Sequence, residues 1–169
     1  RTLKKLYCVL LGLIFLVRFG VSQIDSLMVV SSQNDLDAVK ALRSIGKIYK
    51  RNSEYEKANL FFHKNINLAR ELSEKEEMWK GYIDLLNLKN IVIQPDSVVF
   101  YATVLIEEIG DEKSELANQC LSYSYLFIGK AAQYDLSDYE KAYTAYSKGL
   151  LYALEAEDGV LYLDFKWNI

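Results

Sequence analysis

Apolar residues recur along this chain at the three- and four-residue spacing of amphipathic helices. Leu42, Ile45, Gly46 and Tyr49 stand at i, i+3, i+4 and i+7, which places all four on one helical face. Similar stretches follow one another at short intervals, and no strand-like alternation separates them. The pattern predicts an all-α protein with helices over residues 36–51, 54–72, 75–90, 96–109, 112–133 and 138–156, and a further helix from residue 159.

One stretch of nineteen residues occurs twice, 84 positions apart. Residues 53–71 and 137–155 are identical at eight positions and begin with the hexamers SEYEKA and SDYEKA. Both begin with Ser-x-x-Glu, a capping box that marks a helix start, and Ser73 begins a third. Ser53, Ser73 and Ser137 are therefore predicted to cap helices with their side chains. Repetition of this length indicates stacked structural units, here two units of about 42 residues for the 84-residue offset.

Each copy of the repeat is preceded by a partner helix, so the unit is a pair of helices. Upstream of the second copy, Tyr125, Ile128, Gly129 and Ala132 repeat the spacing seen from Leu42 onward. Glycine inside a helix costs about 1 kcal/mol relative to alanine, so two glycines at equivalent places indicate close helix packing. Between the copies a middle unit is less regular. It keeps an apolar spacing at Trp79, Tyr82, Ile83 and Leu86, and its second helix is predicted to begin at Pro95 and Asp96 and to end at Gly110.

These positions resemble the tetratricopeptide repeat family, whose signature is W-x₂-L-G-x₂-Y followed by Ala and Phe. The matching positions are Leu42, Ile45, Gly46, Tyr49, Ala58 and Phe62 in the first unit, and Tyr125, Ile128, Gly129, Ala142 and Tyr146 in the last complete unit. The resemblance implies antiparallel helix pairs stacked as a superhelix, and a role in binding a protein or peptide. Units of this length behind an export signal are also similar to the N-terminal sensory arrays of bacterial histidine kinases and helix-turn-helix regulators.

The chain departs from the family signature at several places. Leu42 replaces the aromatic residue, and Ala132 replaces the tyrosine, with one extra residue in the turn that follows. The middle unit keeps Trp79 but loses the glycine, and Arg70 stands near the place of the terminal proline. The helical pattern from residue 159 stops before it could pair. We therefore expect the repeat array to span residues 36–169 and to be truncated at its C-terminal side.

The first residues have the pattern of a secretory signal peptide. Lys4 and Lys5 precede an apolar run from Leu6 to Val17, and the small residues Gly20 and Ser22 follow. We expect residues 1–22 to be removed after Ser22, residues 23–35 to form a linker, and the mature protein to be exported to the periplasm or cell envelope. The alternative is a membrane-anchored assembly factor that retains residues 6–17, although twelve apolar residues are short for a membrane span.

The net negative charge of the chain argues against a nucleic-acid partner. The whole chain has a net charge of −3. Loss of residues 1–22 takes away four basic residues and no acid, which leaves −7. An acidic domain of this kind does not attract a polyanion in general.

A row of basic residues nevertheless follows one face of the first predicted helix. Lys40, Arg43 and Lys47 lie opposite its apolar stripe at helical spacing. First helices of stacked pairs line one face of the array, so these residues could hold an acidic peptide or a C-terminal carboxylate. An ordinary solvated face is the alternative. The candidate groove residues are Lys40, Arg43, Lys47, Lys50, Lys80, Asp84, Asn87, Lys130 and Gln133.

Catalytic and metal chemistry find little support in the sequence. His63 is the single histidine, and no set of Cys, Asp or Glu residues complements it for metal binding. Cys120 lies in an apolar stretch, where a buried and inert thiol is expected. Acids in SEKEEMW and EEIGDEKSE lie at helix ends, which explains them without acid–base chemistry. We expect a non-enzymatic binding scaffold without a cofactor, and keep open the alternative that this is the helical region of an enzyme whose catalytic domain is missing.

Overall fold

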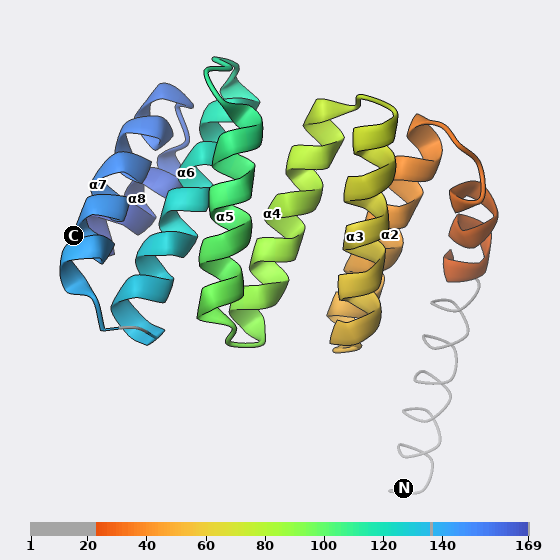
Figure 1. The fold of residues 1–169 in the computed structure, drawn as a ribbon, viewed down its shortest axis with the longest axis horizontal. Helices are drawn as coiled ribbons and strands as arrows, with labels where there is room; N and C mark the ends of the chain where they lie inside the picture. The colour runs from red at the N-terminus through yellow and green to blue at the C-terminus, as the bar shows by residue number, and fades with distance from the viewer. Residues whose placement is uncertain (1–22, 136, 169) are drawn as a thin grey trace, which may run out of the picture.

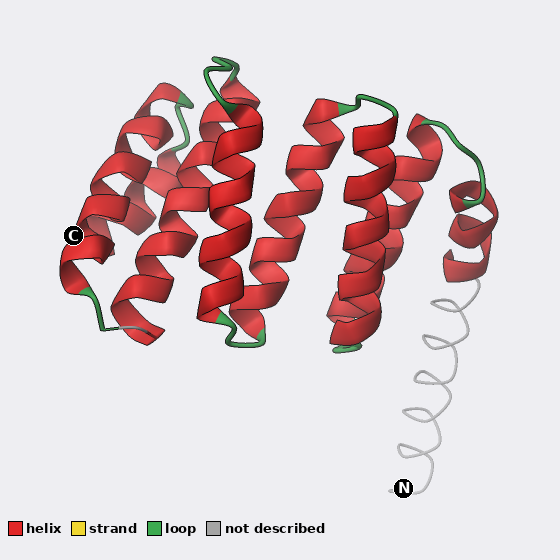
Figure 2. Ribbon diagram, viewed as in Figure 1, coloured by secondary structure: helices red, strands yellow, loops and turns green. Residues whose placement is uncertain are grey.

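The computed structural model describes residues 23–135 and 137–168, and this part of the chain is all-α. Its helices pack one after another in antiparallel fashion, and Figure 2 shows no strand among the described residues. Residues 23–31, within the expected linker, are helical. The helices that follow are α2 (Leu36–Arg51), α3 (Tyr55–Glu71), α4 (Lys75–Ile91), α5 (Pro95–Ile109), α6 (Glu115–Lys130), α7 (Tyr139–Glu155) and α8 (Gly159–Asn168).

The seven helices predicted from residue 36 onward are all present, with one local difference. The helix expected over residues 112–133 is α-helical from Glu115 to Lys130 and continues as a π-helical segment, η1 (Ala131–Asp135). A π-helical turn holds an extra residue, so this segment takes up the extra residue that the sequence places before the last repeat. The predicted leader, residues 1–22, and the anchor alternative at residues 6–17 lie outside the described residues. No helix of the described part is both long and apolar enough to cross a membrane.

The helices form two layers. We call α2, α4, α6 and α8 the first layer, because each of these helices contacts the next one of the set. The second layer consists of α3, α5 and α7, and each of its helices packs against the two first-layer helices that flank it in sequence. In Figure 1, α3 and α7 lie in front of α2 and α8. Each helix therefore contacts near neighbours in the sequence, and the buried side chains between the layers form separate groups, the largest of which extends from Val39 to Ala131.

The two predicted glycine contacts are present in the core. An added Cβ at Gly46 would lie 2.6 Å from Cε1 of Phe62, and one at Gly129 would lie still closer to Cε1 of Tyr146. Both rings are almost fully buried, Phe62 at 0% exposure and Tyr146 at 1%. Each glycine thus lets an aromatic ring of the partner helix approach the backbone, as the spacing predicted.

The middle unit follows the first at an offset of 40 residues, which is within the 84-residue repeat expected to comprise two units of about 42. Burial in α2 recurs in α4 at this offset, so Tyr82 rather than Trp79 takes the place of Leu42. The missing glycine is then explained because the large and the small side chain have exchanged places between the two helices of the unit. Leu86 stands where the first unit has Gly46, Ala102 stands where it has Phe62, and both are 0% exposed.

The turns between helices show why the predicted serine caps are wrong. Ser53, Ser73 and Ser137 have φ angles of 61°, 59° and 53°, so each is the left-handed residue that ends the preceding helix. In each turn the N-cap is the residue after the serine. After Ser53 and Ser73 it is Glu54 and Glu74, and neither makes a side-chain capping bond. These turns contain three residues, and the backbone closes them: the amide of Glu54, for example, donates to the carbonyl of Tyr49 at 2.9 Å.

The same left-handed position recurs in the middle unit at Ile93, where it should lower the stability of the fold. Ile93 has a φ of 53° and is 73% exposed. A β-branched residue is strained in this region of φ, and glycine is not. We expect Ile93→Gly to raise the free energy of unfolding by about 1 kcal/mol, measured by urea denaturation.

The neighbouring residue provides the control for this prediction. Val92 has a φ of −88°, where glycine gains nothing and loses chain entropy. Val92→Gly should therefore destabilise the protein. Equal effects of the two substitutions would contradict the strain assigned to Ile93.

Candidate functional site

The candidate groove residues of α2 and α4 meet on the first layer. The Nε of Arg43 donates to Oδ2 of Asp84 at 2.6 Å, and the Nζ of Lys47 lies 3.4 Å from the same oxygen. The Asp84 side chain is 12% exposed, Arg43 is 23% exposed and Lys47 is 43% exposed. The sequence placed these residues on equivalent sides of the first helices of two successive units, and the structure joins them in an ion-pair network.

Two acids of this network were not among the predicted site residues. Glu77 lies 2.9 Å from the Nζ of Lys80 and 3.6 Å from NH1 of Arg43, and Glu76 lies 3.7 Å from Lys80. Both occupy the first turn of α4, as the helix-end interpretation expected. Their position toward α2 depends on how the helices pack, and helix-end chemistry alone does not reveal it. The network contains three cations and three acids, so its charges balance.

The remaining candidate residues have different surroundings. Lys40 and Lys50 of α2, and Lys130 of α6, have no carboxylate within 4.0 Å among the described residues. Asn87 is half-buried on α4. Gln133 lies in η1, where its Oε1 accepts a hydrogen bond of 2.8 Å from the hydroxyl of Tyr146. Lys40, Lys50 and Lys130 are therefore the cations of the candidate groove that a partner would find unpaired.

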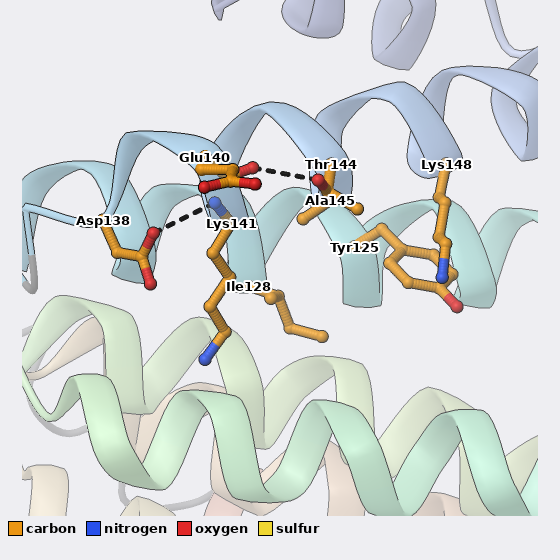
Figure 3. A pocket seen from close by; sticks show the side chains of 8 residues that line it. All are labelled: Tyr125, Ile128, Asp138, Glu140, Lys141, Thr144, Ala145 and Lys148. Carbon is orange, nitrogen blue, oxygen red and sulfur yellow. Dashed lines mark hydrogen bonds between the residues drawn. The ribbon is translucent and has the colours of Figure 1, made fainter.

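A second candidate site is an open pocket of about 410 Å³ between α6 and α7 (Figure 3). Its apolar floor consists of Tyr125, Ile128 and Ala145. The charged residues around it are Asp138, Glu140, Lys141 and Lys148, and Thr144 completes the lining. In Figure 3 the side chains of Ile128 and Lys141 extend from α6 and α7 toward α5, which runs along the other side of the opening.

The reason for this opening is the residue at one repeat position. The first unit has Phe61 there, 6% exposed and stacked on Tyr49 with ring centroids 5.5 Å apart. The middle unit has Tyr101, whose ring lies 5.6 Å from that of His63 on α3. In the last unit the equivalent residue is Ala145. An aromatic ring thus lies between successive second-layer helices in the middle unit, and a methyl group leaves that place open in the last.

His63 takes part in a contact between α3 and α5. Its Nε2 lies 3.4 Å from the hydroxyl of Tyr101. Burial, helped by the positive charge of Lys89, lowers the pKa of His63 below its usual value, which favours the neutral ring at pH 7. Among the described residues no group of three or more His, Cys, Asp or Glu side chains is placed to hold a metal ion. The position of His63 is that of a packing residue.

Cys120 is buried in α6, and burial raises the pKa of its thiol to about 12. The reactive thiolate is then a very small fraction at neutral pH. In a Cys8→Ser variant, which leaves Cys120 as the one thiol, we expect a thiol reagent at pH 8 to react much more slowly with the folded protein than with the protein in guanidinium. Equal rates in the two conditions would contradict the buried position of Cys120.

Comparison of the chain with protein-family models, with curated proteins and with solved structures found no match. The interpretation of both candidate sites therefore depends on their geometry and chemistry.

Proposed function

We propose that this chain is a non-enzymatic scaffold that binds a protein segment or peptide along its first layer. In this proposal the helix pairs form a tetratricopeptide-like superhelix, and the partner lies across α2, α4 and α6. The observation that carries the proposal is the meeting of side chains from successive units on one surface, as in the contact of Arg43 and Lys47 with Asp84. A segment that follows this surface would contact several units at once, and its affinity would grow with the number of units engaged.

The chemistry of the described residues supports binding more than catalysis. The Cys120 thiol is protonated at neutral pH and His63 packs against Tyr101. Lys40, Lys50 and Lys130 remain available for carboxylates of a partner, so an acidic protein segment is the class of ligand that we propose. Because the network of Arg43, Lys47 and Lys80 is already balanced by acids, these three residues position α2 against α4 in this proposal.

Site-specific photo-crosslinking tests the function. A photoreactive amino acid is placed at position 40, 50 or 130 on the first layer, and at position 64 on the exposed side of α3 as a control. After incubation with a cell-envelope extract, we expect a discrete crosslinked protein from the first-layer positions and none from position 64. Absence of a discrete product at all three first-layer positions, or the same products from the control, would overturn the proposal.

We also propose that the scaffold is exported, on the pattern of residues 1–22, as the sensory or assembly part of a larger bacterial protein. N-terminal sequencing of the protein from cells tests this. A mature start at Gln23 supports export with cleavage, whereas retention of residues 6–17 supports the anchored assembly factor.

A further inference from the structure

We propose that the pocket between α6 and α7 is a second peptide site, which takes an apolar side chain flanked by two carboxylates. This inference deepens the proposed function and rests on it, although the site lies apart from the first-layer residues Lys40 and Lys50. It is carried by three observations: the place left open by Ala145, the apolar floor beneath it, and two lysines at its rim that have no acidic partner among the side chains that the structure describes.

The apolar floor has the size and chemistry for one or two side chains. Tyr125 and Ile128 are half-buried although their counterparts in the first unit, Leu42 and Ile45, are 6% and 0% exposed. The Tyr125 ring is held in place by parallel stacking on Tyr152, with centroids 5.7 Å apart and an interplanar angle of 3°. A preformed floor of this kind favours an apolar ligand group, because burial of its surface releases water without a large rearrangement.

Lys141 differs from its counterpart in the first unit. There Lys57 forms an ion pair with Glu54 at 2.6 Å. The residue equivalent to Glu54 is Asp138, whose Oδ1 accepts instead the backbone amide of Lys141 at 3.1 Å. Lys141 therefore has no carboxylate within 4.0 Å of its Nζ among the described residues, and Figure 3 shows its side chain extending across the opening.

Lys148 supplies the second positive charge. Its Nζ lies 5.8 Å from the centroid of the Tyr125 ring, on the floor of the pocket, and it too has no carboxylate partner in the described part of the chain. Glu140 and Asp138 are the acids of the rim, and both stand at the N-terminal end of α7 beside Lys141. The end of the pocket at Lys148 is thus the more positive one.

The spacing of the lysines indicates the form of the ligand. Seven residues separate them on α7, which is about 10 Å along the helix. A peptide in the polyproline II conformation rises about 3.1 Å per residue with three residues per turn, so carboxylates three residues apart lie on one side and span about the same distance. We infer a segment of the form acidic–apolar–x–acidic, with its apolar side chain toward Tyr125 and Ile128.

A defined peptide tests the inference. The probe is the fluorescein-labelled peptide Gly-Glu-Leu-Ala-Glu-Gly, and binding to the full chain is measured by fluorescence polarisation at low ionic strength. We expect the version with both glutamates changed to glutamine, and the version with leucine changed to serine, to bind about tenfold more weakly or worse. Equal binding of the glutamate and glutamine peptides would overturn the inference.

Variants of the chain locate the probe. Ala145→Phe restores the aromatic residue of the other units and should fill the pocket, which weakens binding about tenfold while the lysines remain. Lys141→Ser with Lys148→Ser should weaken binding to a similar extent. The repeat supplies the matched control, Lys57→Ser with Lys64→Ser at the equivalent positions of α3, which should bind the probe as the parent protein does.

The outcomes separate this site from the proposed function. If Ala145→Phe melts normally and still binds the probe fully, the pocket inference fails. If that variant does not fold, the lysine pair and its control decide instead: equal loss in both pairs would also overturn the inference. Crosslinking from positions 40, 50 and 130 reports on the first layer alone, so the scaffold function can fail or hold independently of the pocket.

Discussion

Gly46→Leu is expected to lower the free energy of unfolding by about 1–3 kcal/mol. The physical reason is overpacking. A Cβ at this position would already lie 2.6 Å from the Phe62 ring, and both residues are buried between α2 and α3. The extra methyl groups of leucine would force the two helices apart along the core. Urea denaturation, with far-ultraviolet circular dichroism to confirm that helicity is retained, measures the effect.

The middle unit suggests a rescue for this variant. It packs Leu86 where the first unit has Gly46, and it places the small Ala102 where the first unit has Phe62. Phe62→Ala alone should cost about 3–5 kcal/mol because it leaves a cavity. Adding Gly46→Leu to Phe62→Ala should regain part of that loss, since the large side chain then fills the space.

A surface glycine serves as the control. An added Cβ at Gly159 would meet nothing within 4 Å, so Gly159→Ala should leave stability unchanged or slightly higher. Two results would contradict the packing of α2 against α3 described above. One is a Gly46→Leu variant that melts at the temperature of the parent protein, and the other is a double variant no more stable than Phe62→Ala.

Asp84→Asn should lower the free energy of unfolding by about 1–2 kcal/mol at low salt. The substitution keeps the shape of the side chain but removes the charge that balances Arg43 and Lys47. Loss of one partner from a fully buried ion pair costs about 3–5 kcal/mol, and we expect less here because the two cations are partly exposed. The difference from the parent protein should shrink as salt is added, because ions screen the remaining repulsion.

The matched control for Asp84 is an exposed pair within one helix end. Glu54 pairs with Lys57 at 2.6 Å, but these side chains are 39% and 59% exposed. Glu54→Gln should change stability by only a few tenths of a kcal/mol. Equal losses for Asp84→Asn and Glu54→Gln would mean that the contact between α2 and α4 does not stabilise the stacking of units.

Most of the fold could be predicted from the sequence because the helices are amphipathic and the repeat is strong. Helical spacing placed all the helices from residue 36 onward, and Gly46 and Gly129 indicated close helix packing, which the structure shows to be against Phe62 and Tyr146. The middle unit was harder, because its large and small residues have exchanged places. The sequence pattern placed Trp79 at the first position of the signature, and only the burial of α4 and α5 shows that Leu86 and Ala102 stand in the places of Gly46 and Phe62.

The candidate sites depended more on contacts between helices. Spacing alone placed Arg43 and Lys47 on one face of α2, yet it could not show that Asp84 and Glu77 of α4 reach them. The serine caps were predicted incorrectly because Ser-x-x-Glu also fits a three-residue turn in which the serine ends the previous helix. The pocket at Ala145 could have been found from the repeat, since Phe61 occupies the same position in the first copy.

The core has a seam at α6, with a consequence for mechanical behaviour. One group of buried side chains extends from Val39 to Ala131, and a second group, from Leu126 to Phe165, belongs to α6, η1, α7 and α8. If α7 and α8 detach, the second group loses its cover, whereas of the partly buried side chains packed on the first group only Tyr152 belongs to these helices. A pulling force applied at the C-terminal side should therefore detach α7 and α8 first. The preceding helices would stay folded as a shorter stack, against which α7 and α8 can pack again.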